Sequence, residues 1–211
     1  MFNFSSKTVT NKVWKLTDFL KFIKADKTMK TSAINISTVT LTNVLNEKNT
    51  GLPTCENIKE IYFMELTLTD RVVPLEFIKH LDKKILFQTV YTLIYENNVK
   101  IMLTYKTIDT DKATFTKHYE TKWLTNIAPT TPLNSSLSDT LKDITAIVTE
   151  IPFRAEESFR TYIDRLSEIE KNKKMIIKSE KEINKAKSPK EKLIHHEKMK
   201  QLKIFDAELR S

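Results

Sequence analysis

The sequence predicts an α+β fold, in which a mixed, mainly antiparallel sheet with flanking helices precedes an antiparallel helical hairpin. Residues 86–123 contain three apolar and β-branched segments separated by short polar turns, which is typical of a meander. Residues 159–183 instead place apolar side chains three and four positions apart, the period of a helix that packs along one seam. We therefore expect an α+β domain over residues 1–152 and a lysine-rich, coiled-coil-like helical hairpin over residues 156–211.

The meander begins with residues 86–95, which are apolar on both faces, as expected of a strand that is covered on both sides. Asn97 and Asn98 follow, and because asparagine tolerates positive φ, this pair predicts a two-residue hairpin turn. A second polar turn at residues 109–112 leads into a strand over residues 114–123. Residues 34–45 and 58–68 predict two further strands ahead of the meander.

Capping residues mark the helices of the first domain. Thr17 is the expected N-cap of a short helix over residues 17–24, and Pro74 opens a second helix. Ser136 with Asp139 resembles a capping box and predicts a helix to about Glu150.

The hairpin has a heptad-like seam in its first helix. The d-type positions are all apolar (Tyr162, Ile169, Ile176 and Ile183), whereas two a-type positions are Lys173 and Glu180. Ser188, Pro189 and Glu191 have the spacing of an N-cap, N1 and N3 and predict the start of the second helix. The expected apolar stripe of this helix is Ile194, Met199, Leu202, Phe205 and Leu209.

Composition excludes several classes of protein. The single glycine rules out dinucleotide-binding and Walker-type phosphate loops, and the single cysteine rules out an intramolecular disulfide or a cysteine-based zinc site. We expect no cofactor and no metal. The first residues lack the apolar run of a signal peptide, and no window approaches the ~20 apolar residues of a membrane span. These features predict a cytoplasmic protein without a membrane partner.

A family resemblance rests on the meander and the hairpin. Residues 101–106 read Ile-Met-Leu-Thr-Tyr-Lys, and the next strand ends in Tyr119, Thr121 and Trp123. With its Lys/Glu-rich helical C-terminus, this pattern resembles the bacterial and archaeal family known as domain of unknown function 4391. Residues 10–13 are similar to a stretch that opens family members but lack its usual Pro-Lys continuation. The resemblance implies an accessory role beside helicases and DNA methyltransferases of restriction-modification or phage-defence systems, and it implies no catalytic residues.

Positive charge is concentrated in the hairpin. Residues 171–203 hold twelve lysines and four glutamates, and this excess equals the formal net charge of the whole chain, +8. Such a segment could bind nucleic acid through phosphates, could bind a protein partner, or could be a plain solvated face. The lysines that we single out for nucleic-acid or partner binding are Lys171, Lys173, Lys174, Lys178, Lys181, Lys185, Lys187 and Lys190.

A protein partner is the second interpretation of the hairpin. An isolated pair of helices buries little apolar surface, so it would gain stability from a partner or from a second copy of the chain. The apolar residues of the seam are the expected partner interface: Tyr162, Leu166, Ile169, Ile176 and Ile183.

Catalytic candidates are few. Glu65 lies in an otherwise apolar strand, and with Lys106 on a neighbouring strand it resembles nuclease sites that combine carboxylates with lysine. Those sites need a second carboxylate, and Asp70 lies at the end of the strand. The sequence therefore favours a non-catalytic adaptor that contacts a helicase or methyltransferase, with DNA as a further partner. A nonspecific nucleic-acid-binding module and a small divergent metal-dependent nuclease remain the alternatives.

Overall fold

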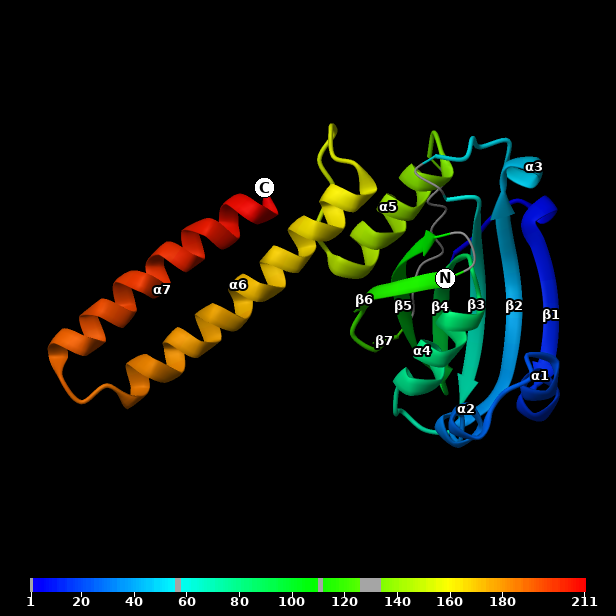
Figure 1. Ribbon diagram of the computed structural model, residues 1–211, viewed down its shortest axis with the longest axis horizontal. Coiled ribbons are helices and arrows are strands. Elements are labelled where there is room, and N and C mark those ends of the chain that lie inside the picture. Colours follow the sequence, from blue (N-terminus) through cyan, green and yellow to red (C-terminus); the bar gives the residue numbers. More distant parts are fainter. Residues whose placement is uncertain (1, 56–57, 110–111, 126–133) are drawn as a thin grey trace. The chain divides into compact units, whose positions relative to one another are not determined.

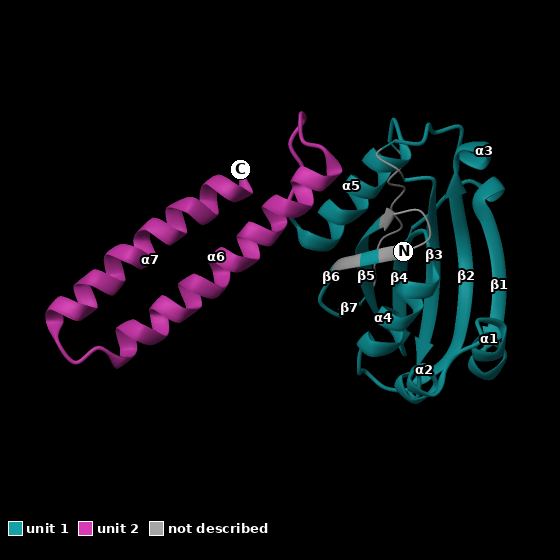
Figure 2. Cartoon of the chain, viewed as in Figure 1, with its two compact units in different colours: residues 1–150 teal, residues 151–211 magenta. Residues whose placement is uncertain are grey.

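The computed structural model describes residues 2–55, 58–109, 112–125 and 134–211 (Figure 1). The chain divides into two compact units, residues 1–150 and residues 151–211 (Figure 2). Each unit is described by itself below. None of the described helices combines the length and the apolar composition that a membrane span requires.

The first unit is built on one mixed sheet with the strand order β1-β2-β3-β4-β5-β6, and a short β7 pairs with β5 (Figure 1). The parallel pair is β3 with β4, and the other neighbours are antiparallel. The mixed, mainly antiparallel sheet predicted from the sequence is therefore confirmed. The strands are β1 Val9–Lys15, β2 Ile36–Asn46, β3 Glu60–Leu68, β4 Gln88–Tyr95, β5 Asn98–Asp109, β6 Lys112–Glu120 and β7 Leu124–Thr125.

Helices lie on both faces of this sheet. One face carries a core of Met64, Leu66, Tyr91, Leu93 and Met102, which packs against buried residues of α1, α2 and α4. Because side chains alternate along a strand, Phe63, Val90 and Leu103 point to the opposite face, where α5 contacts β3, β5 and β6. The helices of this unit are η1 Ser6–Thr8, α1 Leu16–Phe22, α2 Lys27–Ser32, α3 Glu47–Thr50, α4 Leu75–Lys84 and α5 Leu137–Thr149.

The parallel pair β3 and β4 is joined through α4, so this part of the sheet is a βαβ unit. β3 and β4 are interior strands, which explains why β4 is buried along most of its length. In the middle of β3 and β4, alternate side chains therefore point into the core beneath α4, and the side chains between them point to the opposite face of the sheet.

One strand was missed and two local predictions were wrong in detail. Strand β1 was not predicted, because it is a sheet edge whose residues are almost all exposed and show no alternation of burial. The β4–β5 turn lies one residue earlier than expected, since Tyr95 pairs with Asn98 and Glu96 takes the positive φ of 51°. Helix α1 begins at Leu16 after Lys15, so Thr17 lies inside the helix and is not its cap. Residues 110–111 of the second predicted turn lie outside the described residues.

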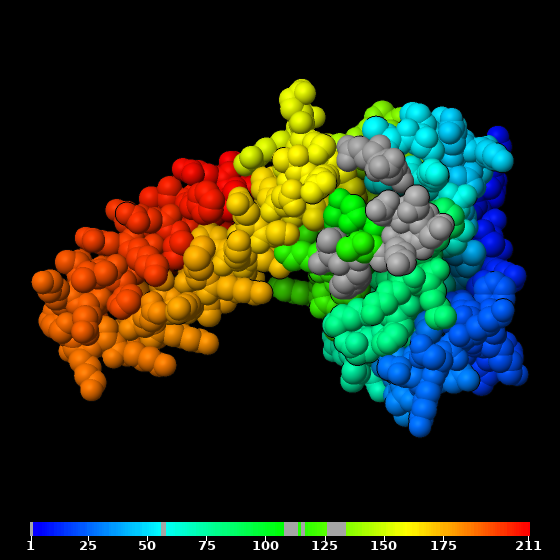
Figure 3. Space-filling view, in the orientation of Figure 1, coloured from blue at the N-terminus to red at the C-terminus, as the bar shows by residue number. Residues whose placement is uncertain are grey.

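The second unit is a helical hairpin of α6 Phe159–Lys185 and α7 Pro189–Arg210. The helices run antiparallel, because Arg165 reaches the carbonyl of Leu209 while Asn172 reaches the carbonyl of Leu202. The predicted capping box of Ser188 and Glu191 with Pro189 at the first position of the helix is confirmed. Side chains project into solvent along this hairpin in the space-filling view (Figure 3, orange to red).

Candidate functional sites

Lys106 and Asp82 form a fully buried ion pair in the first unit. Lys106 lies on β5 on the face covered by α4, and its Nζ is 2.8 Å from Oδ1 of Asp82. Neither side chain is exposed to solvent. The Tyr91 hydroxyl donates a hydrogen bond of 2.7 Å to the same carboxylate oxygen. These groups come from α4, β4 and β5, so the cluster exists only once the helix has packed on the sheet.

The ammonium group of Lys106 has no hydrogen left for a substrate. It donates to the carbonyls of Ile85 and Phe87 at 3.2 and 2.8 Å and to the hydroxyl of Thr89 at 3.2 Å, besides Asp82. An ammonium carries three donors, so four acceptors saturate it. The pKa of Lys106 is lowered, because the effect of burial outweighs the opposing effect of the neighbouring Asp82 carboxylate. We conclude that Lys106 is a structural residue that fastens the segment between α4 and β4 to β5.

Asp82 and Tyr91 were not identified from the sequence as members of this cluster. A signal for Asp82 was present, because the residue follows Ile78 by one helical turn and so lies on the apolar side of α4, next to Leu81. A carboxylate at such a position needs a buried partner. Which strand supplies that partner depends on the packing of the helix and is not visible in the sequence.

Glu65 lies on the other face of the sheet. Its neighbours Met64 and Leu66 point into the core beneath α4, so the alternation of β3 directs Glu65 away from that core and away from Lys106. The predicted combination of Glu65 with Lys106 is therefore not assembled. Glu65 instead lines a pocket of about 400 Å³ together with Phe2, Asn11, Val13, Thr40, Thr42, Asn43, Phe63 and Thr92.

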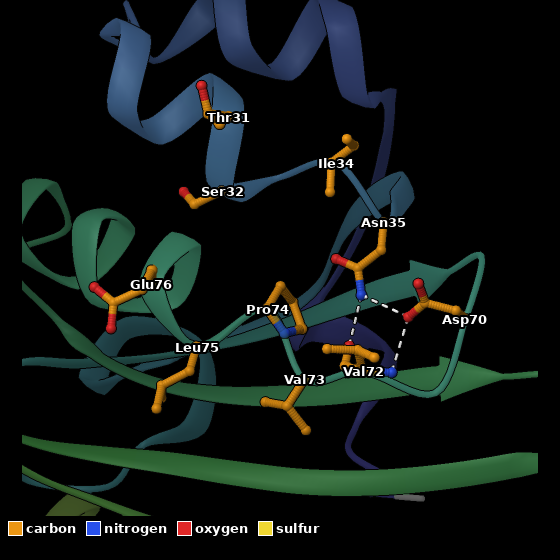
Figure 4. Close-up of a pocket in the computed structure, with 10 residues that line it drawn as sticks. All are labelled: Thr31, Ser32, Ile34, Asn35, Asp70, Val72, Val73, Pro74, Leu75 and Glu76. Carbon is orange, nitrogen blue, oxygen red and sulfur yellow. Dashed lines mark hydrogen bonds between the residues drawn. The ribbon is translucent and has the colours of Figure 1, made fainter.

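Asp70, the second carboxylate considered for a nuclease site, lines a different hollow of about 360 Å³ (Figure 4). The amide of Asn35 donates to Oδ1 of Asp70 at 2.9 Å and to the carbonyl of Val72 at 2.6 Å. The backbone N–H of Val72 also donates to Asp70, at 2.8 Å. The hydrogen bond from Asn35 is the main reason why the pKa of Asp70 is lowered. Asp70 thus closes a turn.

The remaining wall of this hollow is mainly apolar, with Ile34, Val73 and Pro74 among its residues (Figure 4). Its other carboxylate, Glu76, accepts a hydrogen bond of 2.6 Å from Lys79. Both acids at this hollow are therefore already engaged within the protein. Across the described part of the chain, no three His, Cys, Asp or Glu side chains come together in a way that could hold a metal ion.

The seam of the hairpin differs from the heptad assignment made from the sequence. Lys173 and Glu180 are exposed, and Asn172 and Ser179 occupy the buried positions in their place. The a-type positions Phe159 and Leu166 are buried as predicted, but after Leu166 the buried positions lie one residue earlier than assigned, at Asn172 and Ser179. The apolar residues proposed as a partner interface are used within the chain, because Tyr162, Leu166 and Ile169 are buried and Ile176 and Ile183 are half-buried.

The seam of α7 also contains polar residues. It is formed by His195, Met199, Leu202, Asp206 and Leu209. Ile194 and Phe205, which were expected in this seam, are 55% and 43% exposed. Leu193 and Ile204 are similarly exposed, at 60% and 53%. Helix α7 therefore presents four large apolar side chains to solvent.

The lysines of the hairpin are directed outward. All eight lysines singled out from the sequence are exposed: Lys171, Lys173, Lys174, Lys178, Lys181, Lys185, Lys187 and Lys190. Among the residues that the structure describes, Lys178 is the one of these eight with a carboxylate in salt-bridge range, Glu182 at 3.9 Å. The hairpin is therefore electropositive, and internal ion pairs neutralise little of its charge.

The described residues therefore form an α+β domain with a buried structural lysine, followed by a helical hairpin whose singled-out lysines are all exposed. The chain belongs to the family described as domain of unknown function (DUF4391), whose model matches residues 6–204. The resemblance found in the meander and the hairpin is thereby confirmed. No curated protein and no solved structure matches the chain.

Proposed function

We propose that this protein is a non-catalytic adaptor of a bacterial restriction-modification or phage-defence system. Its partner in this proposal is a helicase or a DNA methyltransferase, the classes that the family resemblance implies. The observation that supports an adaptor is the exposed apolar surface of α7, formed by Leu193, Ile194, Ile204 and Phe205, which we call the α7 outer surface.

The α7 outer surface has the chemistry of a protein-binding helix. Leu193 and Ile204 are eleven residues apart, as are Ile194 and Phe205, so each pair lines up along the helix after about three turns. Amphipathic helices bind partner grooves through apolar side chains with such spacings. Exposed lysines surround the surface, for example Lys192, Lys198 and Lys200, so an acidic rim on the partner would complement it.

The rest of the hairpin keeps this surface in place. Arg165 on α6 donates to the carbonyl of Leu209 at 2.8 Å, and Asn172 donates to the carbonyl of Leu202 at 2.8 Å. These bonds orient α7 by polar contacts on its seam and leave its opposite side free for a partner.

Affinity purification from the native host tests the adaptor. We expect a tagged full-length chain to co-purify with a helicase or DNA methyltransferase, identified by mass spectrometry. The double variant Ile194→Glu/Phe205→Glu should reduce recovery of the partner at least ~10-fold, because two charges at an apolar contact cost several kcal/mol.

A matched control is available on the same helix. His196 and Ala207 are exposed, are also eleven residues apart, and lie on the opposite flank of α7. The variant His196→Glu/Ala207→Glu adds two acidic residues and should retain the partner. Equal recovery with both variants, or recovery of neither enzyme class with the wild-type chain, would refute the proposal.

A nonspecific nucleic-acid-binding module is the second candidate. The supporting observation is that seven of the eight hairpin lysines have no carboxylate within salt-bridge range among the described residues. Gel shifts with duplex DNA should then weaken steeply between 50 and 200 mM salt, by roughly 10-fold or more for several phosphate contacts. Replacing Lys171, Lys174, Lys178 and Lys181 by Gln should reduce this salt dependence. Absence of a shift at 50 mM salt excludes this candidate.

A further inference from the structure

Glu65 lies in the interior of the sheet, and its carboxylate has no partner among the described side chains. It lies on β3 between β2 and β4, opposite Thr40 on one side and Thr92 on the other. The residues that precede it on the same face, Ile61 and Phe63, are buried. No hydrogen bond or ion pair connects the side-chain carboxylate of Glu65 with any residue that the structure describes.

This position would favour an apolar or threonine side chain if packing alone decided it. Burial raises the pKa of Glu65, and no nearby charge opposes this effect. A half-buried carboxylate without a donor costs folding free energy, because its hydration is lost and not replaced. Residues that carry such a cost are often found where a ligand provides the missing interaction.

The pocket in front of Glu65 has the size and the chemistry of a ligand site. Its volume of about 400 Å³ falls within the range of small-molecule sites in proteins. No lysine or arginine is among its lining residues, although the chain has a net charge of +8. Among the described lining residues, Glu65 is therefore the one charged side chain, and the ligand that complements its carboxylate is a cation.

The polar groups around Glu65 divide into engaged and free ones. The hydroxyl of Thr42 donates to the carbonyl of Phe63 at 3.1 Å, and the amide of Asn43 donates to the hydroxyl of Thr8 at 3.0 Å. In contrast, no side-chain hydrogen bond joins Thr40 or Thr92 to another described residue. Their hydroxyls flank Glu65 and could accept hydrogen bonds from the same ligand.

One wall of the pocket is aromatic. The ring of Phe63 lies 5.4 Å from the ring of Phe2 and 4.7 Å from the ring of Phe4, measured between centroids. Phe2 and Phe63 both line the pocket. A ligand with an apolar or aromatic body could pack against this wall while its charged end reaches Glu65.

We propose that this pocket binds a small organic cation, in which an ammonium or amidinium group pairs with Glu65 and an apolar body packs against Phe63. A divalent metal ion fits less well, because Ca²⁺ and Mg²⁺ need several oxygen ligands and the pocket supplies one carboxylate. An anion is disfavoured by the same carboxylate. The proposal is independent of the α7 outer surface, which belongs to the other unit.

Benzamidine is a suitable probe, because its planar amidinium matches a carboxylate and its phenyl ring matches the aromatic wall. We expect saturable binding to the full-length chain by isothermal titration calorimetry, with ¹H–¹⁵N shift changes centred on Thr40, Glu65 and Thr92. Benzamide has the same shape without the charge and should bind at least ~10-fold more weakly, a difference of about 1.4 kcal/mol.

Two variants test the role of the carboxylate. Glu65→Gln keeps the size of the side chain and should weaken benzamidine at least ~10-fold while leaving benzamide unchanged. Thr92→Val removes one flanking hydroxyl without changing the charge and should weaken benzamidine by a smaller factor. Circular dichroism checks that both variants are folded. Absence of binding to the wild-type chain, equal affinity for the two probes, equal affinity of Glu65→Gln, or shift changes away from β2–β4 would each overturn the proposal.

Discussion

The ammonium nitrogen of Lys106 and the carboxylate of Asp82 lie 2.8 Å apart with both side chains fully shielded from solvent. The pair joins α4 to β5 at the centre of the first unit, where Tyr91 also donates to Asp82. Breaking a buried ion pair by removing one partner leaves an uncompensated charge, whereas removing both partners does not. We therefore expect a single substitution to lower the free energy of unfolding more than a double substitution that removes both charges.

We expect Lys106→Met to lower the free energy of unfolding by about 3–5 kcal/mol, because Asp82 then remains buried without its cation. The double variant Lys106→Met/Asp82→Leu should be more stable than this single variant. Urea denaturation followed by tryptophan fluorescence measures the effect in the first unit, which contains both tryptophans, Trp14 and Trp123. A loss below about 1 kcal/mol in the single variant would contradict this role of the pair.

The end of α7 is predicted to loosen in acid. Arg165 makes two hydrogen bonds of 2.7 Å to the Glu157 carboxylate and also donates to the carbonyls of Leu209 and Pro152 at 2.8 Å. Burial alone raises the pKa of Glu157, but the hydrogen bonds from Arg165 and from the backbone of Arg154 outweigh it, so the pKa is lowered. The ionised carboxylate therefore stabilises the folded hairpin.

Because the folded pKa of Glu157 is depressed, its contribution is complete above the unfolded value of about 4.3 and is lost as the pH falls through the folded pKa. Hydrogen exchange of a peptide covering residues 200–211 should accelerate, relative to intrinsic rates, as the pH drops from about 5 to 3. Glu157→Gln should exchange faster at pH 7 and show little further acceleration in acid. A variant that retains the wild-type acid response would show that another group is responsible.

The polar seam of the hairpin predicts a stabilising substitution. Asn172 is fully buried, and its amide nitrogen donates to the carbonyl of Leu202, but its Oδ1 has no hydrogen-bond partner among the described residues. An unsatisfied buried oxygen costs about 1–3 kcal/mol. Asn172→Leu should therefore slow amide exchange in α7 by roughly 5- to 30-fold, corresponding to about 1–2 kcal/mol.

Lys173→Leu is the matched control, because it adds the same side chain at the neighbouring exposed position. This control should leave exchange in α7 nearly unchanged. If Lys173→Leu slowed exchange as much as Asn172→Leu, the assignment of Asn172 to the seam would be wrong. A buried polar residue can also define the register of paired helices, so light scattering of Asn172→Leu should be compared with that of the wild-type chain.

In the hairpin, the spacing of apolar residues predicted the helix α6 but not every buried position of its seam. Spacings of three and four residues identified α6, and Ser188, Pro189 and Glu191 placed the start of α7 correctly. The first half of the α6 seam was assigned correctly, but the next a-type position was not, because Asn172 and Lys173 both satisfy the spacing and neither is apolar. Only the position of the facing helix shows that Asn172 is buried.

In the first unit, alternation in β3 predicted a strand and drew attention to Glu65, but it did not say which layer covers each face. Because α4 packs on one face of the sheet, Lys106 is buried beside Asp82 on that face, while Glu65 lines a pocket on the other face. Glu65 and Lys106, which the sequence placed on neighbouring strands, therefore lie on opposite faces of the sheet.

The sequence by itself determined the antiparallel meander, the two strands ahead of it and the helical hairpin, because alternation, turn residues and caps act between residues close in the chain; it did not reveal the edge strand β1. Tertiary structure decided the roles of the charged residues. Lys106 became a structural cation, Glu65 a carboxylate in a pocket, and Ile194 and Phe205 an exposed surface. The burial and pairing of these side chains depend on groups that are distant in the chain and meet only when the helices pack. Local sequence patterns therefore do not predict them.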